Sequence, residues 1–202
     1  MAANPDDVYI TVEDYVEGEQ HSQVRHEYID GYVYAMTGAS DAHVTITLNV
    51  GALLRDHLRG RPCRTYVMDM KVQVNDAGRY FYPDALVTRD ERDRTAEAAY
   101  TKRHPTLIVE VVSSSTEAFD RGRKFAFYRQ IDSLREYILI DPTRLSVDCY
   151  RRGDNGAWIL YPFVEGQEVS FASVDLHSSM ARIYEDVTLE ETPAQENLTE
   201  PR

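Results

Sequence analysis

Cysteine is scarce in this sequence, and long apolar runs are absent from it. Cys63 and Cys149 are the two cysteines among 202 residues, and neither belongs to a CxxC pair or lies near a pair of histidines. The sequence therefore indicates neither a zinc site nor a disulfide framework. No apolar run approaches the roughly 20 residues that span a bilayer, and residues 1–7 lack the basic and apolar regions of a signal peptide. We expect a cytoplasmic protein with no membrane partner.

Positive charge is also in short supply, since 22 Lys and Arg residues face 34 Asp and Glu residues and the formal net charge is −12. Proteins that coat nucleic acid nonspecifically depend on many Lys and Arg contacts to phosphates, so the composition argues against that class. It does not exclude a nuclease, because a local basic patch can hold phosphate on an acidic protein. Taken singly, each basic cluster is more often a solvated face than a phosphate site.

The length of the chain and its 43% hydrophobic content are ordinary for one globular domain with a full core. We predict a single domain over residues 11–187. Residues 1–10 are predicted to form an N-terminal extension. Residues 188–202 are polar and contain proline, which predicts a disordered tail.

Turn signals and apolar patterns predict an α/β fold. Asp30-Gly31 supplies the positive φ angles of a tight hairpin turn, and Ser40 precedes a helix whose apolar positions recur at helical spacing until Gly60. The remaining predicted elements are a short helix opened by Thr11, strands over 64–74, 81–88, 106–112, 136–141, 145–151 and 157–164, a helix over 113–131 and a short helix over 180–186. This order predicts a mixed central β-sheet flanked by helices, with an added N-terminal hairpin and added C-terminal strands.

Two carboxylates lie inside predicted strands. Glu110 is in the middle of the most apolar stretch of the chain, residues 107–112, and Asp84 follows Pro83 one strand earlier. Burying an unpaired ionised carboxylate costs several kcal/mol, so such groups are normally neutralised, paired or bound to a metal. A cation is the simplest joint explanation for both.

The helix after Glu110 carries a candidate partner. Period-2 alternation along the strand predicts that Glu110 faces this helix. Asp120, Lys124 and Tyr128 recur there at every fourth position, which aligns them along one side. We therefore expect Lys124 to lie against the sheet with its ammonium reaching toward the carboxylates. Glu27 lies on the strand before the hairpin turn, and His43 lies near the apolar stripe of the helix that begins after Ser40.

Two carboxylates and a lysine are the groups that metal-assisted phosphodiester hydrolysis requires. Mg²⁺ takes one or two protein carboxylates and fills its remaining positions with waters and substrate phosphate. The metal activates water and neutralises charge in the transition state, while a lysine orients the nucleophile or offsets developing charge.

The order of these landmarks resembles the Uma-type endonuclease family within the restriction-endonuclease-like superfamily, which is named for its PD-(D/E)XK motif. The resemblance covers about residues 11–186. It rests on the following segments in this order: His26-Glu27-Tyr28-Ile29-Asp30-Gly31, His43, Tyr82-Pro83-Asp84, Val109-Glu110-Val111-Val112-Ser113, Asp120 with Lys124 and Tyr128, and Glu136-Tyr137-Ile138-Leu139-Ile140-Asp141-Pro142.

The resemblance implies a restriction-endonuclease-like core that cuts DNA with Mg²⁺, for which Mn²⁺ can substitute. Asp84 and Glu110 would be the metal ligands, and Glu27 an additional acidic residue. The superfamily's lysine normally lies two residues after the glutamate, where this chain has Val112, so the resemblance nominates Lys124 from the next helix. Ser114 stands where family members have proline, which we expect to alter the loop more than the chemistry.

Each nominated residue also has a structural interpretation. Glu110 and Lys124 can form a purely structural ion pair, and Lys124 can instead pair with Asp120 on the helix surface. Glu27 can pair with a neighbour across its hairpin, and Asp84 can cap a turn. His43 and Tyr128 can be packing residues with satisfied polar atoms. Lys71, two residues after Asp69, is a rival for the lysine role.

Two functions of other classes stay open. One is a nuclease-fold module that binds nucleic acid or assembles without cutting. The other is a metal-independent hydrolase of a small substrate that uses Glu27 or Glu110 as general base together with His43. A homodimer would supply the two cuts that a duplex requires, although no interface is identifiable in the sequence.

Overall fold

The computed structural model describes residues 8–75 and 78–189. Most of the predicted extension (1–10) and most of the predicted tail (188–202) lie outside these residues. Within the described ranges, no helix is long and apolar enough to cross a membrane.

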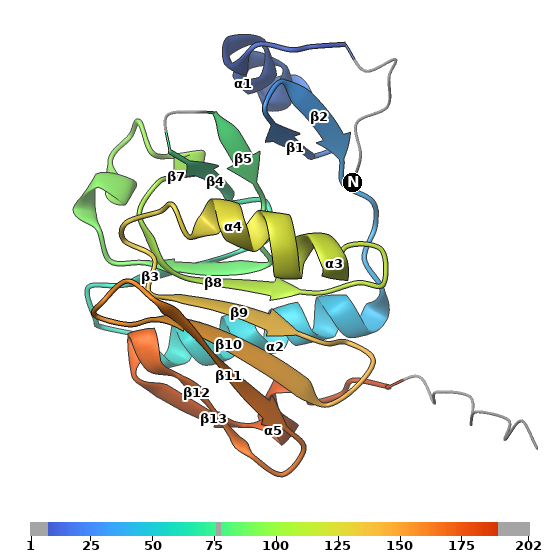
Figure 1. The fold of residues 1–202 in the computed structure, drawn as a ribbon, viewed down its shortest axis with the longest axis vertical. Helices are drawn as coiled ribbons and strands as arrows, with labels where there is room; N and C mark the ends of the chain where they lie inside the picture. The colour runs from blue at the N-terminus through green and yellow to red at the C-terminus, as the bar shows by residue number, and fades with distance from the viewer. Residues whose placement is uncertain (1–7, 76–77, 190–202) are drawn as a thin grey trace, which may run out of the picture.

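A six-stranded mixed sheet forms the centre of the fold (Figure 1). Its strand order is β11-β10-β9-β8-β6-β3. β8 and β9 run parallel, and every other neighbouring pair is antiparallel. The bounds are β3 (Arg64–Val67), β6 (Ala85–Thr88), β8 (Pro105–Val111), β9 (Glu136–Ile140), β10 (Ser146–Arg152) and β11 (Trp158–Val164). The mixed central sheet expected from the sequence is therefore confirmed.

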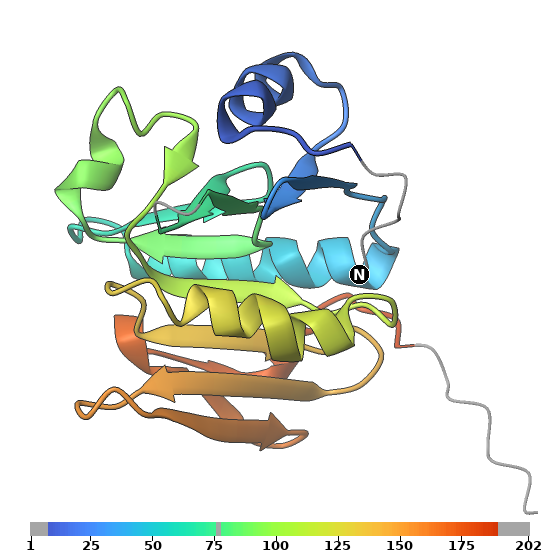
Figure 2. The ribbon, with the colours of Figure 1, turned by 45° about the horizontal axis from the view of Figure 1, so that its top comes forward.

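Helices cover both faces of this sheet (Figure 2). α2 (Asp41–His57) lies on one face, where Ile46 and Val50 pack in one apolar cluster with Val109 and Val111 of β8. The other face is covered by a helical run made of α3 (Glu117–Phe119), the π-helical turn η2 (Asp120–Lys124) and α4 (Phe125–Tyr128). Successive side chains of β8 therefore point to opposite faces of the sheet, and Glu110 lies on the face covered by η2 and α4.

A second sheet, of order β2-β1-β5-β4-β7, carries the N-terminal part of the chain. The hairpin predicted at Asp30-Gly31 is present, with φ angles of 52° and 99°. α1 packs on this sheet through Tyr15, which forms an aromatic cluster with Tyr28 and Tyr80. The bounds are α1 (Val12–His21), β1 (His26–Ile29), β2 (Tyr32–Ala35), β4 (Lys71–Val74), β5 (Arg79–Phe81) and β7 (Thr101–Lys102).

Two predicted strands are each divided between the two sheets. The strand predicted over 64–74 breaks at Met68 and Asp69, whose φ angles of 48° and 32° do not continue a strand. The strand predicted over 81–88 breaks at Pro83, which has no N–H for a sheet ladder. Met68 N donates a hydrogen bond of 2.9 Å to Asp84 O, so the two breaks lie together.

The C-terminal part adds a small sheet of β12 (Glu168–Phe171) and β13 (Leu176–Ser179), with the turn η3 (Ala172–Val174) between them. The short helix predicted over 180–186 is the single turn α5 (Met180–Ile183). The charge-rich connection between β6 and β8 contains η1 (Glu91–Arg94). Buried Asp93 holds this connection by accepting hydrogen bonds from Thr88 Oγ1 and from the backbone N–H groups of Arg103 and His104.

Candidate active site

Lys124 is the centre of a buried group of carboxylates. Its Nζ lies 2.9 Å from Glu27 Oε1, 2.9 Å from Glu110 Oε1 and 3.6 Å from Asp120 Oδ1. All four residues are at most 5% exposed. They come from β1, β8 and η2, so the cluster joins the two sheets and the helix between them. We call Glu27, Glu110, Asp120 and Lys124 the acidic cluster.

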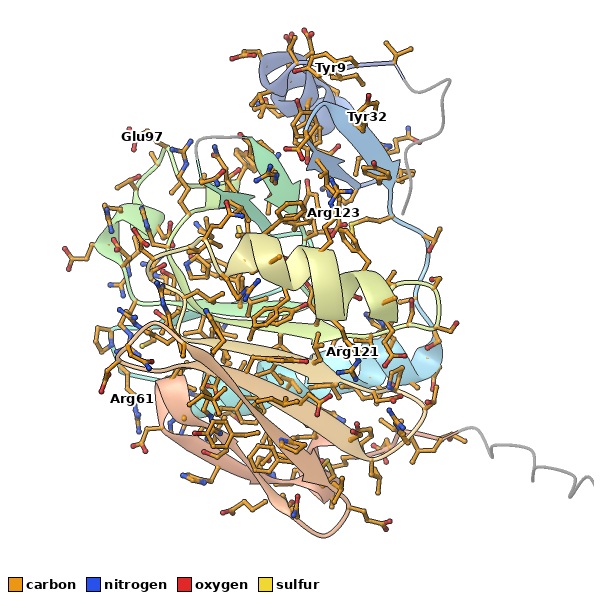
Figure 3. The ribbon with its side chains drawn as sticks, viewed as in Figure 1. Tyr9, Tyr32, Arg61, Glu97, Arg121 and Arg123 are labelled. Atoms are coloured by element: carbon orange, nitrogen blue, oxygen red, sulfur yellow. The ribbon has the colours of Figure 1, made fainter. Side chains whose placement is uncertain are left out.

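The helix presents its polar side chains to the sheet as the spacing predicted. Asp120, Lys124 and Tyr128 are all buried. The turn that contains Asp120 and Lys124 is π-helical, a local irregularity that often occurs at functional sites. Figure 3 shows the flanking arginines on opposite sides of this helix: Arg123 toward the β1–β2 hairpin, and Arg121 toward β10, where it pairs with Asp148.

Two tyrosines fix the geometry of the acidic cluster. Tyr128 Oη donates a hydrogen bond of 3.0 Å to Glu110 Oε1, and Tyr137 Oη donates one of 3.1 Å to the backbone carbonyl of Asp120. Both rings are fully buried. Tyr128 therefore orients the carboxylate of Glu110 as well as filling the core.

Asp84 lies at the edge of the same site. Ala85 of β6 pairs with Val109 of β8, which brings Asp84 beside Glu110 at adjacent strand ends. Its Oδ1 lies 2.7 Å from His43 Nε2, and its Oδ2 accepts a hydrogen bond of 2.7 Å from Val111 N. His43 belongs to the first turn of α2, where Ser40 caps the helix by accepting from His43 N. These contacts do not support the alternative interpretation of Asp84 as a turn cap, because its carboxylate makes hydrogen bonds to a helix and to a neighbouring strand.

The electrostatics of the acidic cluster favour an additional cation or a proton. Burial raises the pKa of Glu110 well above its ordinary value; Lys124 opposes this shift, while Asp120, Asp84 and Glu27 add to it. Burial lowers the pKa of Lys124, but Glu110 and Glu27 outweigh that effect and raise it well above the ordinary value. These shifts favour a protonated Lys124, and the three carboxylates within 3.6 Å of its Nζ outnumber its single positive charge.

The donor chemistry of the site fits a hard divalent cation. Among the residues that the structure describes, no group of three or more His, Cys, Asp or Glu side chains is arranged to hold a metal ion. Mg²⁺ needs fewer protein ligands, since one or two carboxylates suffice when water and phosphate complete its shell. Asp84 and Glu110 on adjacent strands supply two carboxylates. Each oxygen of Asp84 has one hydrogen-bond contact and retains a second lone pair, whereas Glu110 Oε1 already contacts Tyr128 Oη and Lys124 Nζ, so Glu110 would bind a metal through Oε2.

The structure brings together every nominated residue: Asp84, Glu110, Lys124, Glu27, Asp120 and Tyr128, with His43 attached through Asp84. The rival Lys71 lies elsewhere, with its Nζ over the rings of Tyr15 and Tyr80 at 5.1 and 5.5 Å. Sequence reasoning did not nominate Tyr137 or the N–H of Val111. Tyr137 had one available signal, because a tyrosine inside an apolar buried strand needs a partner for its hydroxyl.

A solved structure has the same fold. It is described as a putative nuclease belonging to DUF820 from Anabaena variabilis, and it matches with a TM-score of 0.72 at 18% identity, over 87% of this chain and 97% of that one. The fold is an α/β fold with a restriction-endonuclease-like core, in which Asp84 and Glu110 lie at the ends of adjacent strands.

The chain belongs to the Uma2 family, described as putative restriction endonucleases, whose model matches residues 12–181. Two proteins from Synechocystis, both described as uncharacterized, are similar to this chain in sequence. One is 35% identical over 87% of this chain and 91% of its own length, and the other is 33% identical over 81% and 93%.

Proposed function

We propose that the protein is an endonuclease that hydrolyses phosphodiester bonds in DNA with Mg²⁺, for which Mn²⁺ can substitute. The observation that carries the proposal is the burial of Glu110 and Lys124 in one cluster beside Asp84, with more negative charge than Lys124 balances. Membership of a family described as putative restriction endonucleases supports the same reaction class.

In this proposal Asp84 and Glu110 hold the metal. An ion held by Asp84 and Glu110 would supply Lewis-acid activation and would neutralise charge that develops on the phosphate. Tyr128 holds Glu110 through Oε1, and His43 holds Asp84 through Oδ1, so both carboxylates are oriented before any ligand arrives. Preorganisation of this kind is what electrostatic catalysis requires.

Lys124 supplies the positive charge of the protein itself. Because Glu27, Glu110 and Asp120 surround its Nζ, the ammonium is fixed in position and stays protonated. We assign it the role of donating hydrogen bonds to the transferring phosphate or to the attacking water. Glu27 and Asp120 act as positioning residues for this lysine.

The proposal also includes a homodimer, since two sites are needed to cut both strands of a duplex. Light scattering coupled to size exclusion measures the molar mass, and a monomer at assay concentrations would limit each encounter to one nick.

The experiment is incubation of purified protein with supercoiled plasmid and with single-stranded DNA, in Mg²⁺, Mn²⁺ or chelator. Nicking that requires a divalent ion and is lost in Asp84→Asn and Glu110→Gln supports the proposal. Arg182→Ala, a change at an exposed position in α5, is the matched control and should cut normally. Normal cleavage by either carboxylate variant contradicts the proposed ligands, and activity that survives chelator contradicts the metal.

A further inference from the structure

The central sheet has one long open edge, the strand β11. Within the described part of the chain β11 pairs with β10 alone, and in Figure 2 it is the lowest strand of the sheet. It has seven residues, whereas β3 at the opposite edge has four, and β2 and β7 at the edges of the second sheet have four and two. Short edge strands are one way in which proteins prevent pairing with other chains, and β11 lacks this protection.

The side chains of β11 are apolar at the surface. Four of its large side chains are 39–53% exposed: Ile159, Leu160, Tyr161 and Val164. No residue of the strand is charged, although charged side chains are another common protection of an edge strand. The formal net charge of −12 opposes contact between two copies of this chain over most of the surface. An uncharged edge is therefore where a second copy meets the least repulsion.

The hydrogen bonds of Val164 show which backbone groups of β11 face the open side. Its N–H donates a hydrogen bond of 2.9 Å to Gln167 Oε1, and its carbonyl accepts one of 3.1 Å from Gln167 N, so neither group bonds to β10. Backbone groups alternate between the two sides of an antiparallel strand. The backbone groups of Pro162, Leu160 and Trp158 therefore point away from β10 as well. Pro162 interrupts no bond to β10, and the N–H groups of Leu160 and Trp158 are donors on the open side.

Side-chain contacts on both faces of β11 hold the strand in place. On one face the guanidinium carbon of Arg151 lies 4.4 Å from the centre of the Tyr161 ring, and Arg151 Nε donates a hydrogen bond of 2.9 Å to Glu136 Oε1. On the other face the Trp158 ring meets the Phe125 ring edge-on, with 5.3 Å between the ring centres. A strand that is ordered in advance loses little conformational entropy when it pairs with another strand.

From these observations we infer that β11 is the interface between two copies of this chain, which pair antiparallel about a two-fold axis at Leu160 and join their central sheets. The inference rests on the homodimer included in the proposed function and assigns its surface. In this register the two Leu160 residues exchange both of their hydrogen bonds, and each Trp158 N–H donates to the carbonyl of the partner's Pro162. An axis at Pro162 would instead place two residues without an N–H opposite each other.

The side chains and the other edge of the sheet fit the same dimer. Ile159 lies opposite the partner's Tyr161 in this register, and a β-branched side chain paired with an aromatic one stabilises an antiparallel sheet. Each copy covers the open edge of the other, so the assembly closes as a dimer. The outer edge of the joined sheet is β3, which is short and carries Arg64, and these features oppose further growth. The two-fold match of donors and acceptors around Leu160 favours a second copy over an extended segment of another protein.

The first experiment is disulfide trapping of Leu160→Cys under mild oxidation. Opposed residues of a hydrogen-bonded antiparallel pair have Cα atoms about 5.5 Å apart, a separation that a disulfide spans. Val164→Cys is the matched control, because it is exposed on the same strand but lies roughly 26 Å from its own copy in this register, at about 3.3 Å per residue. The wild type controls for Cys63 and Cys149. We expect a covalent dimer from Leu160→Cys and none from the two controls.

The second experiment is light scattering coupled to size exclusion, on the wild type and on Leu160→Arg over a range of concentrations. We expect a dimeric wild type and a dimer dissociation constant that rises about tenfold or more in Leu160→Arg, because the axis brings two like charges face to face. Leu160 is exposed, and an unchanged circular dichroism spectrum verifies that the variant stays folded. Metal-dependent nicking by both proteins tests the nuclease proposal separately, because β9 and β10 separate β11 from β8.

The outcomes distinguish the interface from the rest of the proposal. Trapping of Leu160→Cys alone, together with a weakened dimer in Leu160→Arg, supports pairing through β11. A dimer that Leu160→Arg leaves unchanged, or equal trapping of Leu160→Cys and Val164→Cys, overturns the inference and leaves the proposed homodimer standing with another interface. A monomeric wild type overturns both the inference and the homodimer, whereas absence of nicking by a dimeric wild type contradicts the nuclease proposal alone.

Discussion

Replacement of Lys124 by methionine removes the ammonium on which Glu27, Glu110 and Asp120 converge. Removing one partner of a buried ion pair costs about 3–5 kcal/mol, whereas an exposed pair of helical neighbours is worth about 0.3–0.5 kcal/mol. Because every member of the acidic cluster is at most 5% exposed, the larger range applies. We expect Lys124→Met to lower the free energy of unfolding by about 3 kcal/mol at pH 8.

The same variant should lose less stability in acid. Burial raises the pKa of Glu110 above its value in the unfolded chain. The contribution of Glu110 to the free energy of unfolding is therefore fully present below the unfolded pKa of about 4.3, and it is lost as the pH rises through the folded pKa. Without Lys124 the folded pKa rises further. The penalty of Lys124→Met should therefore be small near pH 4.5 and grow toward pH 8.

Urea unfolding at several pH values measures how the stability loss in Lys124→Met depends on pH. Arg123→Met, a change at an exposed position on the same helix, is the control. Adding Glu110→Gln to Lys124→Met should recover part of the loss, because the amide needs no counterion. A penalty for Lys124→Met below about 1 kcal/mol, or one independent of pH, would refute the reasoning.

Three further predictions follow from other contacts. Glu110→Gln alone should change the free energy of unfolding by about 1 kcal/mol or less near pH 7, because Tyr128 can still donate a hydrogen bond to the amide oxygen. A loss of more than about 3 kcal/mol in urea unfolding would show instead that the ionised carboxylate is essential to the fold. Burial raises the pKa of Asp141, but hydrogen bonds from Thr143 and Arg144 outweigh this effect and lower the pKa. The stability that Asp141 contributes is therefore present above its unfolded pKa and is lost as the pH falls through its folded pKa. Acid unfolding of Asp141→Asn should lack this pH-dependent component, and identical acid-unfolding curves for the variant and the wild type would contradict the prediction. Gly31→Ala should lower the melting temperature, because φ is +99° there and the new Cβ would clash with the Tyr9 ring; an unchanged melting temperature would exclude this strain.

The site was predictable where it depends on periodic patterns. Glu110 interrupts an apolar strand with period 2, and Lys124 lies four residues from both Asp120 and Tyr128, so their faces follow from strand and helix geometry. The contact between His43 and Asp84 joins residues 41 positions apart. Only the assembled fold, in which α2 begins beside the start of β6, makes that pair visible.

The breaks in the fold were not predictable for a different reason. Val67 to Met70 reads as continuous strand, yet Met68 and Asp69 adopt positive φ angles. Non-glycine residues adopt that region rarely and only when the surrounding structure compensates for the strain. Here Met68 N bonds to Asp84 O, a tertiary contact that local sequence does not encode. The π-helical turn at Asp120–Lys124 likewise departs from the regular helix that the sequence predicted over residues 113–131.

Calorimetric titration of Mg²⁺ and Mn²⁺ into the wild type, Asp84→Asn and Glu110→Gln tests the central claim most directly, because it asks whether the excess buried negative charge is a cation site without requiring a substrate. The account predicts saturable binding to the wild type and loss of binding in both variants. Absence of binding to the wild type, or equal binding by all three proteins, would contradict it.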